Sequence, residues 1–461
     1  MPLPYNGHIA QTNPHPGPHP AQLLPELDGL RAVAAYGILA THAAFQTGTE
    51  SALLERFDYF VAVFFALSAF LLARGEEGAM LRPGYYSRRL ARLAPAYLVC
   101  AAVVLLSLPP LSTATPAQAA ANLLLVQIYV PDGLVEGLTQ MWSLCVEVAF
   151  YLVLPAYLRL GPRGRGLTVA LAVPAGLAWP HLVDAAGLAH APINLQIWPP
   201  SYTPWFAVGL LCAELERLGV RYRGPRWPAA CAALPVAYAA GVIGPPGLTH
   251  PTAWQFNTRV ILGAVFAALI VAPFALGPRQ SGTALSSAPA RTLGRWSYSL
   301  FLWHVAALYF AFPILGLSLF DAPFLPIFLT TAALGTVAAY VSYELVEVPG
   351  ARLVRRLTAG AGAGSGAGSG AGSGHARHAT AKHPVTARNT EPRAPSTAAG
   401  SGVGRGRTCR GNGPAFHARR PRGRRLCRHS GRRGRGNHAG VRGATGREAA
   451  VRARSPRSER R

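Results

Sequence analysis

Charged residues are scarce in this chain of 461 residues. Only 14% of them are Asp, Glu, Lys or Arg, whereas 50% are hydrophobic. Ordinary soluble domains carry about 25% charged residues. The low share therefore argues against an ordinary cytosolic globular protein.

Cysteine is also infrequent, and no two of the six cysteines form a CxxC pair. The sequence thus indicates neither a zinc site nor a disulfide framework, and we expect no metal. Cys100, Cys145, Cys212 and Cys231 lie in apolar runs. A free cysteine in such a run behaves as a small hydrophobic residue, so we predict that these four pack in the interior.

The first 24 residues contain no Lys or Arg and no long apolar stretch. They therefore lack the charged and apolar regions of a secretory signal peptide. Their Pro- and His-rich stretch NPHPGPHP predicts a disordered leader over residues 1–24, with metal binding by the histidines as the alternative.

The net charge of +25 suggests a nucleic-acid-binding protein, but this charge is unevenly distributed. Residues 359–461 hold 23 basic and 3 acidic residues, whereas residues 1–358 hold 21 and 16. The Gly/Ser-rich repeat at 359–374 is typical of a flexible linker, and the Arg/Gly-rich remainder has too few apolar residues to fold. We interpret 359–461 as a linker and a basic disordered tail, and we expect no nucleic-acid partner. Binding of RNA or anionic lipid by the tail is the alternative.

Apolar runs recur between residues 31 and 345. Most approach the ~20 residues that cross a bilayer core, and few show the polar stripe of a soluble amphipathic helix. Ten candidate spans lie near 31–47, 57–73, 93–110, 141–159, 167–187, 200–216, 228–245, 258–276, 297–317 and 323–345. The run at 121–130 is too short to span and is expected in a loop or re-entrant piece. The sequence therefore predicts an all-α polytopic membrane protein with about ten transmembrane helices.

Arginines are sorted to one side of these spans. If the N-terminus is cytoplasmic, eighteen arginines fall in the inner connections, and the outer side receives only Arg56 and Arg259. This asymmetry follows the positive-inside rule. It predicts an even number of spans with both termini in the cytoplasm.

The first span carries Arg31 and His42, which are eleven positions apart. This spacing returns to within about 20° of the starting direction and advances about 16 Å along a helix, so both residues share one face. Arg31 is expected at the cytoplasmic end and His42 deep or towards the outside. Asp28, which precedes Arg31, is a possible site residue that helps to shape the start of the helix.

Three further segments place charged or titratable residues inside spans, where such residues are expensive and indicate function. Arg88, Arg89 and Arg92 lie at the inner end of the third span and suit phosphate groups, with ordinary positive-inside flanking as the alternative. Glu147 falls in the outer half of the fourth span, at a depth compatible with His42. A structural hydrogen bond between helices is the alternative for Glu147, and helix packing is the alternative for His304 in the ninth span.

Six motifs in order resemble those of acyltransferase family 3, a family of integral membrane O-acyltransferases. They are LDGLRAVAAYGILATH (27–42), FFALSAFLLAR (64–74), RRLAR (88–92), WSLCVEVAFYLVLP (142–155), SYSLFLWH (297–304) and YELVEVP (343–349). The resemblance covers roughly residues 25–350, so we define 25–358 as the membrane acyltransferase domain. Departures occur at Ala69, where the family usually has Gly, and at Val148 and Ala149, where it usually has Glu and Gln. No extracytoplasmic esterase domain is expected after this domain.

The resemblance implies transfer of an acyl group, often acetyl, from a cytoplasmic acyl-CoA to a hydroxyl. The acceptor is a carbohydrate, glycolipid or related cell-surface or secreted molecule, and the location is the plasma or inner membrane. Acyl-CoA is then a co-substrate, and no bound cofactor is expected. On this interpretation Arg88, Arg89 and Arg92 bind acyl-CoA, and Arg31 lies at the same inner face. Arg31, His42 and Glu147 are the expected catalytic residues: His42 acts as general base or covalent carrier, and Glu147 orients His42 or stabilises its imidazolium. The terminal-motif residues Glu344 and Glu347 are expected to be structural.

A transporter or flippase of a lipid-linked saccharide is the alternative function. Ten spans with buried charges are typical of that class too. The sequence shows no clear inverted repeat and no matching pair of broken helices, and a transporter would leave its cargo chemically unchanged.

Overall fold

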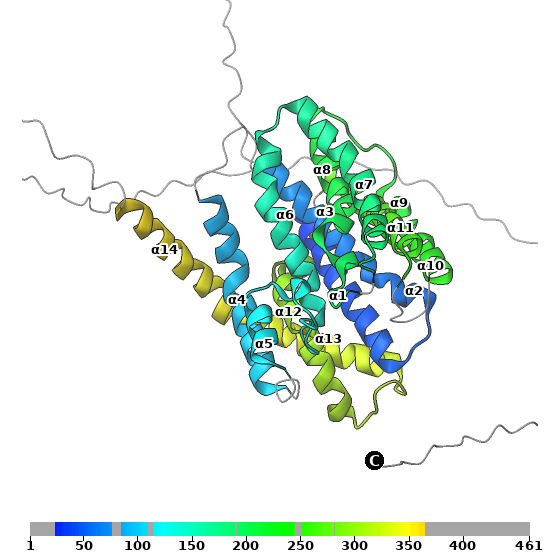
Figure 1. The fold of residues 1–461 in the computed structure, drawn as a ribbon, viewed down its shortest axis with the longest axis vertical. Helices are drawn as coiled ribbons and strands as arrows, with labels where there is room; N and C mark the ends of the chain where they lie inside the picture. Colours follow the sequence, from blue (N-terminus) through cyan, green and yellow to red (C-terminus); the bar gives the residue numbers. More distant parts are fainter. Residues whose placement is uncertain are drawn as a thin grey trace, which may run out of the picture. The chain divides into compact units, whose positions relative to one another are not determined.

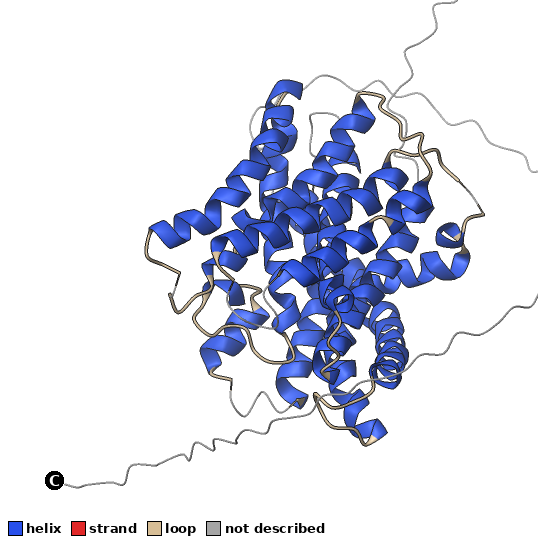
Figure 2. Ribbon diagram, turned by 90° about the vertical axis from the view of Figure 1, so that its right-hand side faces the viewer, coloured by secondary structure: helices blue, strands red, loops and turns tan. Residues whose placement is uncertain are grey.

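The computed structural model describes residues 24–75, 84–108, 114–189, 191–244, 251–280 and 282–364. Within these ranges the regular structure is helical and no strand occurs, which confirms the all-α prediction (Figure 2). The predicted leader, apart from Leu24, and the basic tail beyond Gly364 lie outside the described residues.

Ten helices coincide with the ten predicted spans (Figure 1). They are α1 (Pro25–Thr47), α3 (Phe60–Gly75), α4 (Tyr85–Ser107), α6 (Trp142–Arg159), α7 (Pro162–Ala185), α8 (Thr203–Arg217), α10 (Ala233–Ile243), α11 (Ala253–Ala275), α12 (Ala288–Leu315) and α13 (Phe324–Ser342). The remaining α-helices are α2 (Ala52–Glu55), α5 (Pro116–Leu123), α9 (Arg226–Cys231) and α14 (Val348–Gly364).

Short helical turns connect several of these helices. They are η1 (Arg56–Tyr59), η3 (Gln127–Tyr129), η4 (Thr139–Met141), η5 (Leu195–Ile197), η6 (Pro199–Tyr202) and η7 (Ala284–Ser286). A π-helical turn, η8 (Tyr343–Glu347), joins α13 to α14. The apolar run at 121–130 is divided between the end of α5 and η3, so the prediction that it does not span is confirmed.

Seven helical segments of the described residues are long and apolar enough to cross a membrane. They are Ala52–Gly75, Tyr85–Ser107, Thr139–Arg159, Pro162–Ala185, Ala253–Ala275, Ala288–Leu315 and Phe324–Thr358. The other three predicted spans fall on α1, α8 and α10. Helix α1 is less apolar because it carries Arg31 and His42, while α8 and α10 have only 15 and 11 residues. The polytopic architecture is confirmed. Seven segments rather than ten are long and apolar enough to cross a membrane.

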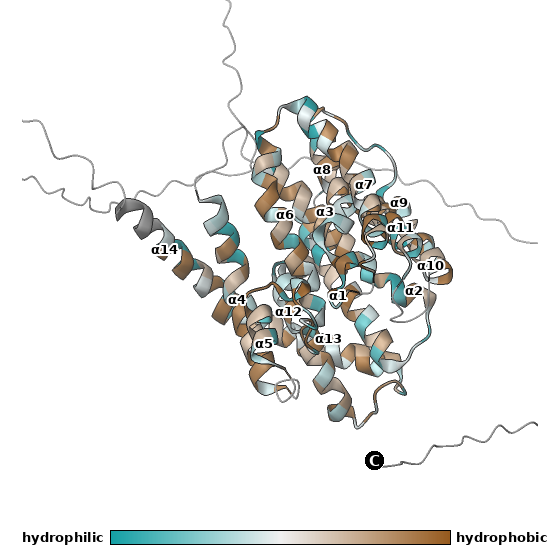
Figure 3. Cartoon of the chain, viewed as in Figure 1, coloured by the Kyte–Doolittle hydropathy of each residue, from teal (hydrophilic) through white to brown (hydrophobic). Residues whose placement is uncertain are grey.

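Burial separates central helices from peripheral ones. In the segments Ala52–Gly75 and Ala288–Leu315, 72% and 67% of the most apolar stretch is buried, against 22% in Pro162–Ala185. Large apolar side chains such as Leu106, Leu152 and Val153 remain exposed, and hydrophobic residues recur along the helices of the bundle (Figure 3). Exposed apolar side chains are what a helix needs where it faces lipid instead of water.

Helix ends gather at two sides of the bundle. At one side Arg74, at the end of α3, forms an ion pair of 2.8 Å with Glu216 of α8. At the other side the Phe320 amide, between α12 and α13, donates to the Gln46 carbonyl near the end of α1 at 2.8 Å. This arrangement is consistent with the alternation that the arginines indicated. Which side faces the cytoplasm stays a prediction.

Two glycines let the first turns of α1 approach the segment that begins α12. A Cβ atom on Gly29 would lie 2.3 Å from the Leu285 carbonyl oxygen, and one on Gly294 would lie 2.0 Å from the Asp28 carbonyl oxygen. Only glycine permits such contact between backbones. The approach fixes α1 beside α12, and both helices then run in the same direction.

A Gly294→Ala substitution is expected to destabilise the protein by about 1–3 kcal/mol, because the added methyl group overpacks this contact. The matched control is Gly166→Ala in α7, where an added Cβ meets no atom within 4 Å. The control is expected to stabilise α7 by about 1 kcal/mol, since alanine favours helix over glycine. Apparent thermal unfolding midpoints in detergent test both. Equal midpoints for the two variants would contradict the close approach.

One expectation about the cysteines is wrong. Cys100, Cys145 and Cys212 are buried as predicted, but Cys231 is exposed, because it ends the short helix α9 instead of lying within a long span. Helix α14 ends at Gly364, six residues past the predicted domain end at residue 358.

Candidate active site

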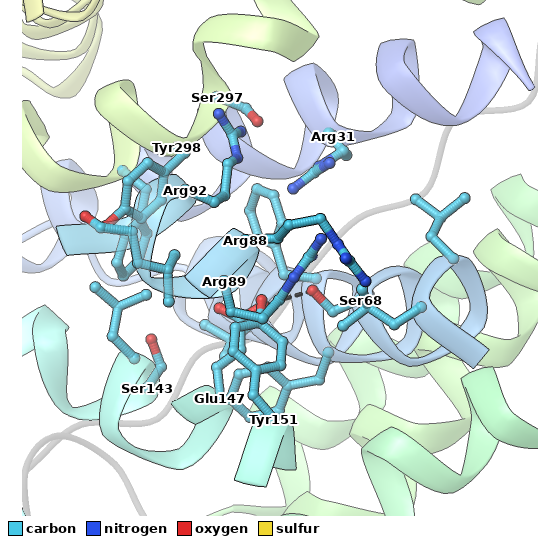
Figure 4. A pocket seen from close by; sticks show the side chains of 18 of the residues that line it. Arg31, Ser68, Arg88, Arg89, Arg92, Ser143, Glu147, Tyr151, Ser297 and Tyr298 are labelled. Carbon is cyan, nitrogen blue, oxygen red and sulfur yellow. Dashed lines mark hydrogen bonds between the residues drawn. The ribbon is translucent and has the colours of Figure 1, made fainter. Parts of the chain in front are cut away.

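A cavity of about 300 Å³ lies among α1, α3, α4, α6 and α12, with Arg355 of α14 at its wall (Figure 4). This volume is at the lower end of the range of about 300–1,000 Å³ typical of small-molecule sites. Its lining includes five residues selected from the sequence: Arg31, Arg88, Arg89, Arg92 and Glu147. We call it the arginine cavity.

Helix α4 supplies three of these arginines within its first two turns. The helix begins after Gly84, which has a left-handed φ of 77° and no side chain that caps the helix. The positive end of the helix dipole therefore faces Arg88, Arg89 and Arg92, an arrangement that is unfavourable without negative charge nearby. The Arg89 guanidinium lies 5.9 Å from the centre of the Tyr85 ring, which stabilises part of this charge.

The negative charge nearest to Arg92 comes from the π-helical turn. Arg92 forms an ion pair with Glu347, whose other carboxylate oxygen accepts a hydrogen bond of 2.9 Å from Ser299. The Arg92 guanidinium also lies 5.5 Å from the centre of the Tyr298 ring. Glu347 is only 2% exposed, which agrees with the structural role expected for it. Arg92 is thus held in place by the protein itself.

Arg31 and Arg89, unlike Arg92, each have a donor that is available for a ligand. The Nε atom of each is buried and has no hydrogen-bond partner among the described residues. A buried donor without a partner costs free energy, which an anionic ligand in the cavity would recover. Figure 4 shows the Arg31 side chain on α1 facing the arginines of α4 across this space. The cavity therefore offers a charge-assisted site for phosphate or carboxylate oxygens.

Glu147 is held by two hydroxyl groups on the cavity wall. Its Oε1 atom accepts hydrogen bonds of 2.5 Å from Ser68 on α3 and from Tyr151 one turn along α6. The predicted contact between Glu147 and His42 is not among its hydrogen bonds. The error arose because similar depth along two helices does not establish that the two side chains face each other. The bond to Ser68 instead matches the alternative interpretation, a hydrogen bond between helices.

A Tyr151→Phe substitution is expected to destabilise the protein by about 1–3 kcal/mol, because it removes one of the two donors to the partly buried Glu147 carboxyl group. The matched control is Tyr86→Phe. The Tyr86 hydroxyl is exposed, and its hydrogen bond to the Leu152 carbonyl oxygen is long, at 3.4 Å. Its removal should therefore have little effect. Thermal unfolding midpoints in detergent check the difference. A Tyr151→Phe midpoint no lower than that of Tyr86→Phe would contradict the bonding scheme of Glu147.

His304 is the partner of His42. The Nδ1 atom of His42 lies 2.8 Å from Nε2 of His304, and the ring centres are 4.9 Å apart. Neither histidine lines the arginine cavity, but Ile38 and Phe301, about one helical turn before them, do. The pair therefore lies further along α1 and α12, just beyond the end of the cavity that Ile38 and Phe301 line.

Asp28 lies outside the cavity lining, in the first turn of α1. Its carboxylate is favourable near the positive end of the helix dipole. Burial raises the pKa of its carboxyl group, while the nearby charges of Arg31 and Arg295 oppose this shift. Its backbone carbonyl lies against Gly294, a contact that does not involve its side chain.

Six polar or charged cavity residues were missed in the sequence: Ser68, Ser143, Tyr151, Ser297, Tyr298 and Arg355. All but Arg355 lie inside the quoted motifs, and Tyr151 follows Glu147 by four positions, a spacing that places both on one helix face. Arg355 was counted only as an inner flanking residue, because nothing in its local sequence indicates that α14 returns to α4. Among the described residues, no group of three or more His, Cys, Asp or Glu side chains is placed to hold a metal ion.

Comparisons with known proteins agree with this architecture. The acyltransferase domain model of acyltransferase family 3 matches residues 24–344. The chain is 30% identical over 370 residues to the acyltransferase MdmB of Streptomyces mycarofaciens, an alignment that covers 72% of this chain and 93% of MdmB.

Two relatives named OatA are longer than the region they share with this chain. The O-acetyltransferase OatA of Staphylococcus aureus (strain NCTC 8325 / PS 47) is 25% identical over 366 residues, which cover 71% of this chain and 57% of that protein. The peptidoglycan O-acetyltransferase OatA of Listeria monocytogenes is 21% identical over 352 residues, which cover 71% and 55%. No solved structure matches the chain significantly. The extent of the family match and the membrane-spanning helices together show that the chain belongs to acyltransferase family 3 and is a multi-pass O-acyltransferase of the plasma membrane.

Proposed function

We propose that this protein transfers an acyl group, acetyl in the first instance, from cytoplasmic acyl-CoA to a hydroxyl group of a carbohydrate acceptor. The observation that carries the proposal is the arginine cavity, where five guanidinium groups surround a space of about 300 Å³. Only one carboxyl group, that of Glu147, is among the residues that line it. Such an excess of positive charge suits a polyanionic ligand.

The phosphate groups of acyl-CoA are the reason for proposing it as the acyl donor. Coenzyme A carries several phosphate groups, and guanidinium groups bind phosphate through paired, charge-assisted hydrogen bonds. Arg31 and Arg89 have buried Nε donors without partners, so they are the residues best prepared for this contact. The cavity holds only part of such a ligand, and the acyl end must extend beyond it. Helix α1 gives the direction, since His42 lies about 16 Å further along the face that carries Arg31.

His42 is the proposed general base of the reaction. In the step we propose, His42 removes the proton from the acceptor hydroxyl as its oxygen attacks the thioester carbonyl carbon. A carbon–oxygen bond forms, the carbon–sulfur bond breaks, and the thiolate of coenzyme A takes the proton back from His42. Transfer through an acyl-imidazole on His42 is the variant of this mechanism in which the histidine is the nucleophile.

The proposed acceptor class rests on the relatives. OatA of Listeria monocytogenes is named a peptidoglycan O-acetyltransferase, and OatA of Staphylococcus aureus an O-acetyltransferase. Both names describe transfer of an acetyl group to an oxygen atom, and peptidoglycan contains a carbohydrate polymer. Membership of an enzyme family also favours transfer over the alternative of a saccharide transporter.

Release of coenzyme A from acetyl-CoA tests the proposal. The purified full chain in detergent is mixed with acetyl-CoA and a panel of saccharide acceptors, and free thiol is followed over time. We expect acceptor-dependent release together with an ester on the acceptor, detected by mass spectrometry. Binding of a saccharide without release of thiol or ester formation, across the panel, would instead indicate a transporter.

A further inference from the structure

The two histidines form a chain of hydrogen bonds that ends on the backbone. The Nδ1 atom of His304 lies 2.7 Å from the Phe301 carbonyl oxygen, and its Nε2 atom lies 2.8 Å from Nδ1 of His42. His304 is 1% exposed, whereas His42 retains part of its surface exposed. The position of each proton in this chain follows from what the two hydrogen-bonded partners can donate or accept.

The carbonyl oxygen of Phe301 can only accept a hydrogen bond, so Nδ1 of His304 must carry a proton. His304 is buried, and its hydrogen bonds include no carboxylate, so a charged imidazolium would be costly there. In the neutral ring, Nε2 of His304 is then an acceptor. Nδ1 of His42 must therefore be the donor of the 2.8 Å bond.

We propose that His304 is a positioning residue that fixes His42 as the tautomer with its proton on Nδ1. The Nε2 atom of His42 then carries the free lone pair, which is the form a general base needs. This inference rests on the proposed function, in which His42 removes the proton of the acceptor hydroxyl. After that transfer both nitrogens of His42 are protonated, and Nε2 of His304 continues to accept from Nδ1, so the ring keeps its orientation.

Nitrogen NMR tests the tautomer directly and does not depend on activity. The full chain is labelled with ¹⁵N at histidine, purified in detergent, and compared with the His42→Ala and His304→Ala variants, which identify the two residues by the signals they remove. We expect Nδ1 of both histidines to give the shift of a protonated nitrogen and Nε2 of both to give that of an unprotonated one. A proton on Nε2 of His42 in the wild-type protein would overturn the assignment.

Kinetics separate positioning from simple packing. A His304→Leu substitution fills similar space but offers no acceptor, so kcat for acyl transfer is expected to fall about 10²-fold or more, as when a catalytic histidine loses the partner that sets its tautomer. The KM for acyl-CoA should change little. In His304→Gln the amide oxygen can replace Nε2 as acceptor, and much of kcat should return. The control is His181→Leu in α7, at a histidine that contacts Trp254 edge to face. This substitution should leave kcat unchanged.

Two results would contradict the positioning role. One is a His304→Leu enzyme with wild-type kcat, and the other is an equal loss in the Leu and Gln variants when both retain the wild-type unfolding midpoint. Failure of the proposed function is recognised separately, because it leaves wild-type protein without acyl transfer to any acceptor. An active wild-type enzyme with the wrong tautomer would overturn only the role given to His304.

Discussion

Replacing His42 by alanine is expected to lower kcat for acyl transfer by about 10²–10⁴-fold, the contribution typical of a general base. Binding of acyl-CoA should be almost unchanged, because His42 is not among the residues that line the arginine cavity. The rate of coenzyme A release at saturating acetyl-CoA measures the first effect. Equilibrium binding of labelled acetyl-CoA measures the second.

The control for this substitution is His181→Ala, which removes a histidine ring without touching α1 or α12. Its rate should equal that of the wild-type protein. If His42→Ala turned over at the wild-type rate, the catalytic assignment of His42 would be wrong. If it lost acetyl-CoA binding as well as rate, His42 would belong to the donor site instead.

The second large effect is expected at the arginine cavity. Arg31→Gln and Arg89→Gln should each raise the Kd for acetyl-CoA by about 10–100-fold, since a hydrogen bond to a charged group contributes about 1.5–3 kcal/mol. The double variant should bind more weakly than either single one. Calorimetric titration of the full chain in detergent measures these affinities.

Arg352→Gln on α14 provides the matched control, because Arg352 is exposed and does not line the cavity. Its Kd should equal that of the wild-type protein. An unchanged Kd in the Arg31→Gln and Arg89→Gln double variant would return these arginines to the role of topology determinants. A loss of equal size in the Arg352 control would point to a diffuse electrostatic effect.

Much of the fold followed from local properties of the chain. Runs of apolar residues marked the helices, and the Arg31 to His42 spacing placed both residues on α1. The positions of helix ends were less predictable, because the apolar pattern does not show where a chain stops packing. The exposure of Cys231 and the end of α14 at Gly364 were therefore not predicted.

The candidate site was predictable residue by residue but not in its pairings. Arg31, Arg88, Arg89, Arg92 and Glu147 were selected because charge inside a membrane span is costly, and they do meet in one cavity. Which helices stand next to each other depends on close contacts such as Gly294 against the Asp28 backbone, and these have no local signature. His42 was therefore matched to Glu147 when its actual neighbour is His304.

The arginine cavity and the histidine pair lie at different places along α1 and α12. Positive charge is concentrated at the arginine cavity, where Glu347 already holds Arg92 and leaves Arg31 and Arg89 with spare donors. The histidine pair lies further along α1 and α12, where it contacts no arginine in its hydrogen bonds. Binding of the donor and proton transfer should therefore respond to different substitutions. The His42 and Arg31/Arg89 experiments exploit that difference.

Transfer of label from acetyl-CoA tests the central claim most directly. The full chain is reconstituted in lipid vesicles with acetyl-CoA labelled with ¹⁴C in the acetyl group and a saccharide acceptor. We predict alkali-labile label on the acceptor and an equal amount of free coenzyme A with wild-type protein, and formation of both at least about 100-fold more slowly with His42→Ala. Label that remained on acetyl-CoA with wild-type protein across the acceptor panel, or that reached the acceptor equally well with His42→Ala, would contradict the account.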